Sequence, residues 1–173
     1  MQSTSMKETA SSLGAQFIRE LESELRATRE CLQVVPMDKP DWKPHDKSMP
    51  LGYLAILTAD IPRWIQYAIE KGEVDFATYP QAKATTPEEL VAHFDKSAED
   101  AKRALEQVSD DRLKETFYLR NDGQELMNAP IDETIMSSIN HMVHHRGQLT
   151  VYMRLLDIAV PSIYGPSADS KGF

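Results

Sequence analysis

Hydrophobic side chains return every three or four residues in four long stretches of the chain, which is the spacing of amphipathic helices. The stretches cover about residues 10–33, 48–72, 86–107 and 131–158. In the first of them, glutamates and arginines occupy the opposite, solvent-facing side of the helix. Four such helices with little strand between them predict an all-α fold, a four-helix bundle.

Local capping signals indicate where some of these helices begin and end. Ser48 is a candidate N-cap for the second helix, and Gly72 is expected to end it. The four residues from Thr86 to Glu89 form a capping box, with Pro87 at the first helical position. The third helix therefore has the clearest start in the chain.

The connections between the helices differ in length and composition. Three prolines interrupt residues 36–48, which we interpret as a long crossover loop. Residues 73–85 are expected to form a second loop. The β-prone run at 116–119 is followed by the turn sequence Asn-Asp-Gly at 121–123. Residues 115–129 therefore predict a small hairpin or an irregular excursion before the last helix.

The length of the chain fits one domain. It has 173 residues, of which 41% are hydrophobic and 27% charged, an ordinary globular composition. Residues 1–8 are small and polar and are expected to be disordered. Residues 9–173 are expected to form the single domain.

Charge and cysteine content narrow the partners and the compartment. The net charge is −8, and no run of lysine and arginine offers a basic patch, so we expect no nucleic-acid partner. No stretch approaches 18 apolar residues, and no secretory signal is evident, so we expect no membrane span and a cytoplasmic location. Cys31 is the only cysteine, which fits a reducing compartment.

Histidine is sparse, yet three of the five histidines fall within five residues of the last helix. At about 100° per residue, His141 and His145 lie about 40° apart on one helix face, whereas His144 points to the other side. The same stripe is continued by Ser138, Gln148 and Tyr152.

Two interpretations of this stripe remain open. Two imidazoles one turn apart can ligate one cation, and imidazole suits zinc, nickel and iron. The alternative is a pair of polar histidines at the edge of the core, hydrogen-bonded to Gln148, Tyr152 or a carboxylate. An apolar side chain facing the two imidazoles would lower the histidine pKa values and favour neutral rings.

The sequence resembles a known family in three places. Residues 140–149, Asn-His-Met-Val-His-His-Arg-Gly-Gln-Leu, resemble the signature of the DinB-like superfamily, whose members are often called damage-inducible proteins. Residues 48–55 resemble the start of that family's second helix, and residues 160–169 its C-terminal tail. The resemblance implies a four-helix bundle, commonly a homodimer, with a metal held by three histidines.

Two of these three histidines map onto His141 and His145. The third is expected on the second helix, shortly after the Leu-Ala pair at 54–55, and Leu57 occupies that position. Leucine cannot ligate a metal, so the resemblance leaves the site one ligand short.

Three residues are candidates for the missing ligand. Asp60 lies one turn beyond Leu57 and could supply an oxygen, as a weak third ligand. His93 on the third helix or His45 in the first loop could also reach the site. Each also has a purely structural interpretation, as a helix carboxylate, a partly exposed polar residue and a loop residue held by Asp46.

Two classes of function follow from these alternatives. The resemblance implies a divalent metal, zinc, nickel or iron, that could serve a metal-dependent thiol transferase or isomerase acting on a small thiol. The alternative is a non-catalytic, metal-free bundle that binds a small ligand or acts as a structural homodimer. Whether the chain is an enzyme stays open. The expected pocket is lined by Tyr53, Leu57, Trp64, His141, His145 and Tyr152.

Arg146 lies beside the apolar stripe of the last helix. A cation there needs a carboxylate partner, from a neighbouring helix or from a dimer mate. The other interpretation is that it anchors an anionic substrate.

Overall fold

The computed structural model describes residues 12–171 of the chain. Its elements, in order, are α1 (Ser12–Gln33), α2 (Leu51–Glu70), β1 (Glu73–Asp75), α3 (Pro87–Gln107), α4 (Asp110–Leu113), β2 (Thr116–Asn121), β3 (Gln124–Pro130) and α5 (Ile131–Leu155). The segment 1–8, expected to be disordered, lies outside the described residues. Between residues 12 and 171, no helix is both long and apolar enough to cross a membrane.

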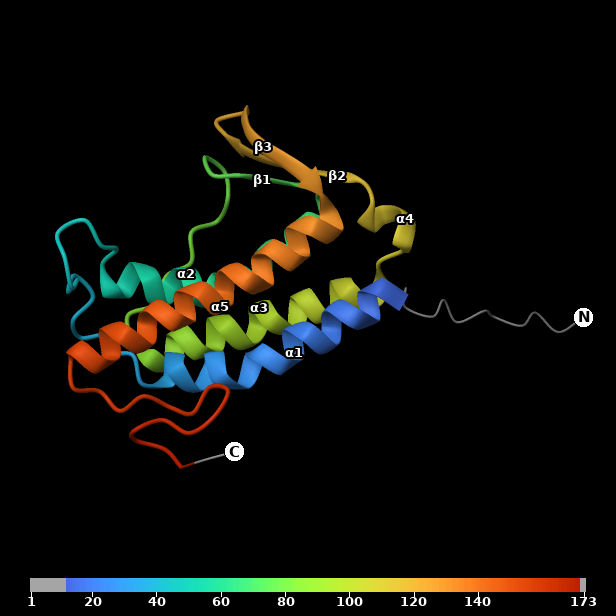
Figure 1. Ribbon diagram of the computed structural model, residues 1–173. Coiled ribbons are helices and arrows are strands. Elements are labelled where there is room, and N and C mark those ends of the chain that lie inside the picture. Colours follow the sequence, from blue (N-terminus) through green and yellow to red (C-terminus); the bar gives the residue numbers. More distant parts are fainter. Residues whose placement is uncertain (1–11, 172–173) are drawn as a thin grey trace, which may run out of the picture.

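The four long helices pack side by side, so the chain is mostly helical as its hydrophobic spacing predicts. α2 packs against α3 and α5, and α1 packs against the same two helices. α1 and α5 run in one direction, whereas α2 and α3 run in the other (Figure 1). The apolar stripes of all four helices meet in the core, where Leu21, Leu54, Phe94 and Leu149 are fully buried.

The connection that returns the chain along the bundle is not the one expected. The proline-containing loop after α1 only reverses the chain, because α2 runs back beside the bundle in the opposite direction (Figure 1). α2 and α3 are parallel, so residues 71–86 must cover the length of a 20-residue helix, about 30 Å. These residues can span up to about 50 Å when extended. Proline content identified a loop at 36–48 but carried no information about its direction.

The fold is also not purely helical. A three-stranded sheet in the order β1-β2-β3 lies over the end of the bundle where α5 begins (Figure 1). β2 and β3 form an antiparallel hairpin, which confirms the hairpin interpretation of residues 115–129. β1 pairs in parallel with β2 from within residues 73–85, which were expected to be only a loop. Three residues are too short to show a periodic pattern, and the partner strand is distant in sequence.

The hairpin turn explains why this short strand forms. Asp122 and Gly123 have φ angles of 51° and 74°, the positive values that a two-residue type I′ turn requires. The Asp75 carboxylate accepts hydrogen bonds from the backbone amides of Asp122, at 2.9 Å, and Gly123, at 2.7 Å. The Gly123 amide and its neighbours hold the pKa of Asp75 below its ordinary value. The last residue of β1 therefore fastens the turn of the hairpin.

The helix ends agree with the capping signals in part. The Thr86 hydroxyl accepts a hydrogen bond from the Glu89 amide at 3.2 Å, as the capping box predicts. The Glu89 carboxylate accepts hydrogen bonds from the amide and hydroxyl of Thr85, the residue before the cap. Ser48 is not the N-cap of α2, because Pro50 occupies that position without a side-chain hydrogen bond.

Candidate functional site

His141 and His145 meet on one face of α5, as their spacing predicts. Their Nε2 atoms are 2.7 Å apart, and their ring centroids are 4.4 Å apart. The side-chain oxygen of Gln148 lies 2.7 Å from Nδ1 of His145. His145 is buried and His141 is partly buried. The three side chains therefore form a continuous line of hydrogen bonds along the helix.

These distances define which nitrogen carries each proton when both rings are neutral. With the Gln148 amide in this orientation, His145 donates from Nδ1, and its Nε2 is left unprotonated. His141 then donates from its own Nε2 to Nε2 of His145. The pair satisfies itself as one donor and one acceptor, and Nδ1 of His141 is the ring nitrogen that remains unprotonated.

The electrostatics of the pair favour neutral rings. Burial, together with the neighbouring His145 and His144, lowers the pKa of His141 to about 4. Burial also lowers the pKa of His145, with the Gln148 hydrogen bond opposing the shift. This direction agrees with the expectation from the sequence.

The low pKa of His141 makes stability depend on pH. The unfolded chain, with a pKa of 6.5, binds more protons than the folded chain, with a pKa of about 4. The free energy of unfolding is therefore unaffected by this ring above pH 6.5, and it falls as the pH drops towards 4. We expect a loss of about 2 kcal/mol, a value reduced for the partial exposure of the ring. Urea midpoints in the presence of EDTA, measured at a series of pH values, check this.

Two variants isolate the contribution of this ring. His141→Phe should remove most of the pH slope, since it keeps an aromatic ring that cannot titrate. His45→Phe is the matched control, because His45 is exposed in the first loop and lies outside the pair. An unchanged slope in His141→Phe would contradict the assignment.

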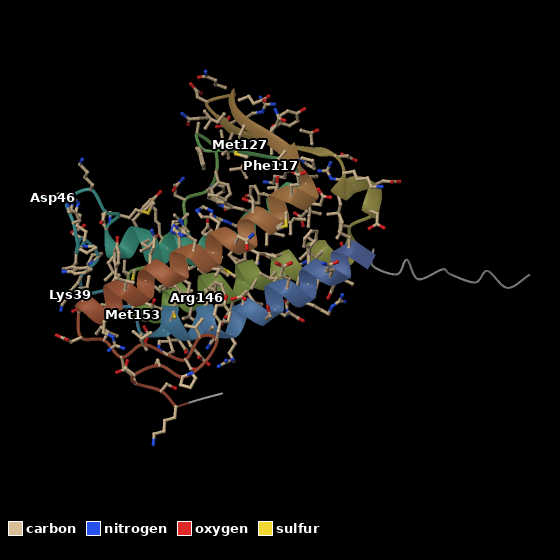
Figure 2. All side chains as sticks on the ribbon, viewed as in Figure 1. Lys39, Asp46, Phe117, Met127, Arg146 and Met153 are labelled. Atoms are coloured by element: carbon tan, nitrogen blue, oxygen red, sulfur yellow. The ribbon has the colours of Figure 1, made fainter. Side chains whose placement is uncertain are left out.

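A cavity of about 510 Å³ lies between the sheet and the helices, and His141 forms part of its wall. Its roof is one face of the sheet, because the register aligns Val74 with Leu119, Leu119 with Met127, and Phe117 with Ala129. All five of these residues line the cavity. Figure 2 labels Phe117 and Met127 at the sheet, near the beginning of α5.

The rest of this cavity, which we call the sheet cavity, is built by the helices and by the segment after β1. Trp64 of α2 and Phe76 contribute aromatic rings to the wall, and their ring centroids are 6.3 Å apart. The Trp64 ring also lies 5.6 Å from the ring of His141. The first turns of α5 contribute Glu133, Thr134, Ser137 and Ser138. The sheet cavity therefore has a mostly apolar wall, with its polar groups along α5.

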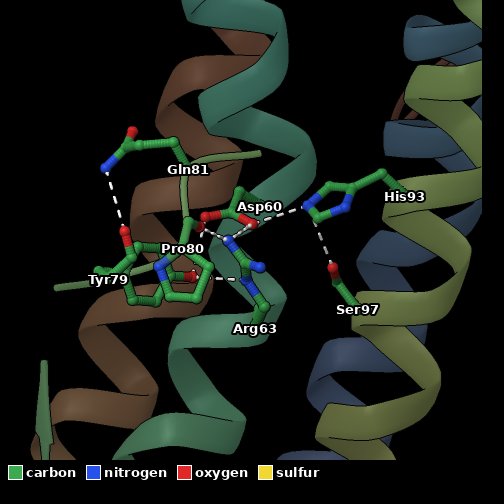
Figure 3. Close-up of polar contacts among 7 residues, drawn as sticks. All are labelled: Asp60, Arg63, Tyr79, Pro80, Gln81, His93 and Ser97. Carbon is green, nitrogen blue, oxygen red and sulfur yellow. Dashed lines mark hydrogen bonds and ion pairs between the residues drawn. The ribbon is translucent and has the colours of Figure 1, made fainter. Parts of the chain in front are cut away.

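Asp60 belongs to a different cluster, which Figure 3 shows. Its carboxylate is 2.7 Å from both Nη2 of Arg63 and Nε2 of His93, and it accepts a 2.8 Å hydrogen bond from the Tyr79 hydroxyl. Arg63 also donates to the Tyr79 hydroxyl and to the backbone oxygen of Pro80. The cluster therefore ties the segment after β1 to α2 and α3.

The charge of this cluster is internally balanced. Burial opposes the charged form of Asp60, but the His93 contact, the Arg63 charge and the Tyr79 hydrogen bond together lower its pKa. Ser97 lies 3.5 Å from the same Nε2 of His93 that faces Asp60. A relay from Ser97 to Asp60 through both ring nitrogens of His93 is therefore not formed.

Leu57 lies in the wall of a second cavity, of about 390 Å³. This second cavity shares Trp64 and Phe76 with the sheet cavity, and it also contacts Asp60 and Tyr53. Four of the six residues expected to line one pocket are thus divided between two cavities, and His145 lines neither of them. Tyr152 belongs to neither wall; it packs edge-on against Trp42 and donates to the backbone oxygen of Met49.

The described residues do not fit the three-histidine metal site that the family resemblance implies. Two imidazoles converge, but Leu57 offers no ligand. The side chains of Asp60 and His93 are hydrogen-bonded to each other. His45 accepts a hydrogen bond from the Lys47 amide in its own loop. Among residues 12–171, no group of three or more His, Cys, Asp or Glu side chains could hold a metal.

Arg146 has a carboxylate partner within the same chain. Its Nη1 lies 2.7 Å from Oε2 of Glu24 and 3.1 Å from the Thr28 hydroxyl, and Nη2 donates to the Tyr164 hydroxyl at 2.8 Å. Figure 2 labels Arg146 where α5 passes α1. A structural role therefore accounts for the buried charge of this arginine. The same guanidinium also holds the C-terminal segment through Tyr164.

The sheet cavity was not found from the sequence, although part of its signal was present. Phe117 and Leu119 alternate with other residues along one run, and Asn128 separates Met127 from Ala129 in the next. Alternation of this kind indicates a strand with one buried face. The short length of each run and the missing third strand hid what that face covers.

Together, four long helices, a sheet over one end, and a histidine pair of which His141 lines the cavity beneath the sheet define a helical-bundle protein with a histidine in its cavity wall. The chain matches the DinB family over residues 5–171. It belongs to the DinB family, as residues 140–149 predict.

Comparison with curated proteins gives a short match. The chain is 45% identical to the uncharacterized protein YrdA of Bacillus subtilis (strain 168) over 47 residues, which are 27% of this chain and 26% of YrdA. The match thus spans about a quarter of the length of that protein.

Solved structures match over most of the chain. A DinB-like protein, YjoA, from Bacillus subtilis has a TM-score of 0.65 at 19% identity, covering 86% of this chain and 96% of that one. A DinB-like protein from Bacillus cereus ATCC 10987 has a TM-score of 0.62 at 22% identity, covering 87% and 97%. A member of the family from Exiguobacterium sibiricum 255-15 has a TM-score of 0.63 at 18% identity, covering 88% and 97%. At such identities these matches establish the fold alone.

Proposed function

We propose that this DinB-family chain binds a small, largely apolar molecule in the sheet cavity, with His141, held by its partner His145, as a polar group at the wall. The observation that supports the proposal is that His141 lines a cavity whose other walls are mainly apolar. A cavity of about 510 Å³ lies in the usual size range of small-molecule sites.

The physical basis is burial of apolar surface against a fixed polar group. Apolar contact contributes about 25 cal/mol for each Å² removed from water. His141 keeps an unprotonated Nδ1 in the tautomer described above, since its Nε2 donates to His145. A neutral ring of this kind can accept a hydrogen bond without the desolvation cost of a buried cation.

Filling the cavity tests the proposal. Ala129→Phe places a ring in the space under the sheet, whereas Asn128→Phe places the same ring on the outer face of the same strand. We expect aromatic fragments detected by ligand-observed NMR to bind the parent and Asn128→Phe, and to bind Ala129→Phe at least ten-fold more weakly. Circular dichroism confirms that both variants are folded. Equal binding by the two variants would overturn the proposal.

A second candidate is a divalent cation held by His141 and His145 alone, with water completing its coordination. The convergence of both Nε2 atoms on one side of α5 favours it, as does Gln148, which orients the His145 ring from behind. Such a site should be labile, because it has two protein ligands instead of three. The thiol transferase or isomerase activity suggested by the family resemblance depends on this candidate.

Metal content separates the two candidates. Untagged protein is dialysed against zinc, nickel or ferrous iron and analysed by mass spectrometry, with His145→Ala as the control. Close to one equivalent that disappears in His145→Ala would support the cation site. Metal at background level in both proteins would refute it and leave the cavity proposal untouched.

A further inference from the structure

In the described part of the chain, the sheet cavity has a single charged side chain in its lining, and its charge is negative. Among the residues that the structure describes, Glu133, on the first turn of α5, is the one carboxylate in the lining, and neither lysine nor arginine occurs there. Within residues 12–171 its carboxylate makes no salt bridge. An anionic ligand would therefore meet repulsion and no compensating cation.

The polar groups near Glu133 are suited to a hydrogen-bond donor. Ser137 lies one helical turn beyond Glu133, and both line the cavity. A carboxylate and a hydroxyl can together accept two of the three hydrogens of an ammonium group. The opposite wall is the apolar face of the sheet, with Phe117, Leu119 and Met127.

The lining is therefore amphipathic, with an acidic edge on α5 and an apolar roof. We propose that the ligand is a small primary amine with an aromatic or aliphatic body, held with its ammonium group at Glu133 and Ser137 and its apolar part under the sheet. This inference rests on the proposed function, and it adds the charge and orientation of the ligand.

Trp64 provides a direct reporter of binding. It lines the cavity, and the only other tryptophan, Trp42, packs against Tyr152 outside that wall. In a Trp42→Phe background, indole fluorescence reports from Trp64 alone. The probes are 2-phenylethylamine, 2-phenylethanol and 3-phenylpropanoate, which share an aromatic ring and differ in the charge of the polar end.

We expect 2-phenylethylamine to bind most tightly and 3-phenylpropanoate most weakly. Glu133→Gln should weaken binding of the amine by about three- to five-fold, the range of a solvent-accessible ion pair, and leave the alcohol within two-fold. Asp132→Asn is the matched control. It removes the same charge from the same helical turn, and Asp132 does not line the cavity.

Each outcome separates this inference from the proposed function. If the alcohol binds as tightly as the amine, or if Asp132→Asn acts as strongly as Glu133→Gln, the amine assignment is overturned while the cavity remains a binding site. If Ala129→Phe weakens the binding of none of the three probes, the proposed function itself fails.

Discussion

Replacing Arg146 by methionine should lower the free energy of unfolding by about 3–5 kcal/mol, the usual cost of removing one partner of a buried ion pair. The arginine side chain is 2% exposed and its partner Glu24 is 14% exposed. Without the guanidinium, the Glu24 carboxylate keeps its charge in a poorly solvated position. Thr28 and Tyr164 lose the cation that they contact. The melting temperature should fall by about 10 °C.

Two comparisons show whether burial is the cause. Arg154→Met removes an arginine that is 49% exposed and pairs with Asp169, so its cost should stay below about 1 kcal/mol. The double variant Arg146→Met with Glu24→Met should recover much of the loss, because it leaves no unpaired charge. Urea denaturation followed by circular dichroism measures all three. A small effect in Arg146→Met alone would refute the buried-pair account.

The second large effect is expected for Asp60→Asn, at about 2–3 kcal/mol. This is below the range for a fully buried pair because the Arg63 side chain is 18% exposed. An amide of the same size keeps the packing but leaves Arg63 without its carboxylate. It also weakens the contacts with Tyr79 and His93. Hydrogen exchange should speed up in the segment after β1, which these contacts fasten.

The pH dependence gives an independent check on Asp60. Its pKa is lowered in the folded protein, so its contribution is present above the unfolded pKa of a carboxylate and is lost as the pH falls through the folded value. Asp60→Asn should reduce this acid sensitivity below about pH 4.

Asp95→Asn, which breaks an exposed pair with Arg29, should cost less than about 1 kcal/mol. Equal losses of unfolding free energy in Asp60→Asn and Asp95→Asn would show that burial does not determine the contribution of the Asp60 cluster.

The parts of the fold that could be predicted are those carried by local spacing. The helical stripes and the contact between His141 and His145 follow from the geometry of a single helix. The hairpin follows from Asp122 and Gly123, which suit a turn with positive φ at both positions. In each case, neighbouring residues in the sequence contain the information.

The remaining features depend on contacts between distant segments. Tyr79 and His93 reach Asp60 across 19 and 33 residues, and no local pattern links them. β1 exists because β2 pairs with it and because Asp75 binds the hairpin turn. The return path of residues 71–86 depends on which helices pack together, which loop length does not specify. The family resemblance gave His141 and His145 as candidate site residues, but the cavity that His141 lines required the packed sheet.

Trp64 links the two cavities. One indole forms part of the wall of each, and its ring nitrogen finds no hydrogen-bond acceptor among the residues that the structure describes. An unpaired buried donor costs about 1–3 kcal/mol, so the present position of the indole is held by packing instead of by a polar contact. A molecule that displaces the ring in one cavity changes the shape of the other. An occupant that moves this ring would couple the two compartments thermodynamically, and the affinity of each would then change by the same factor in both directions.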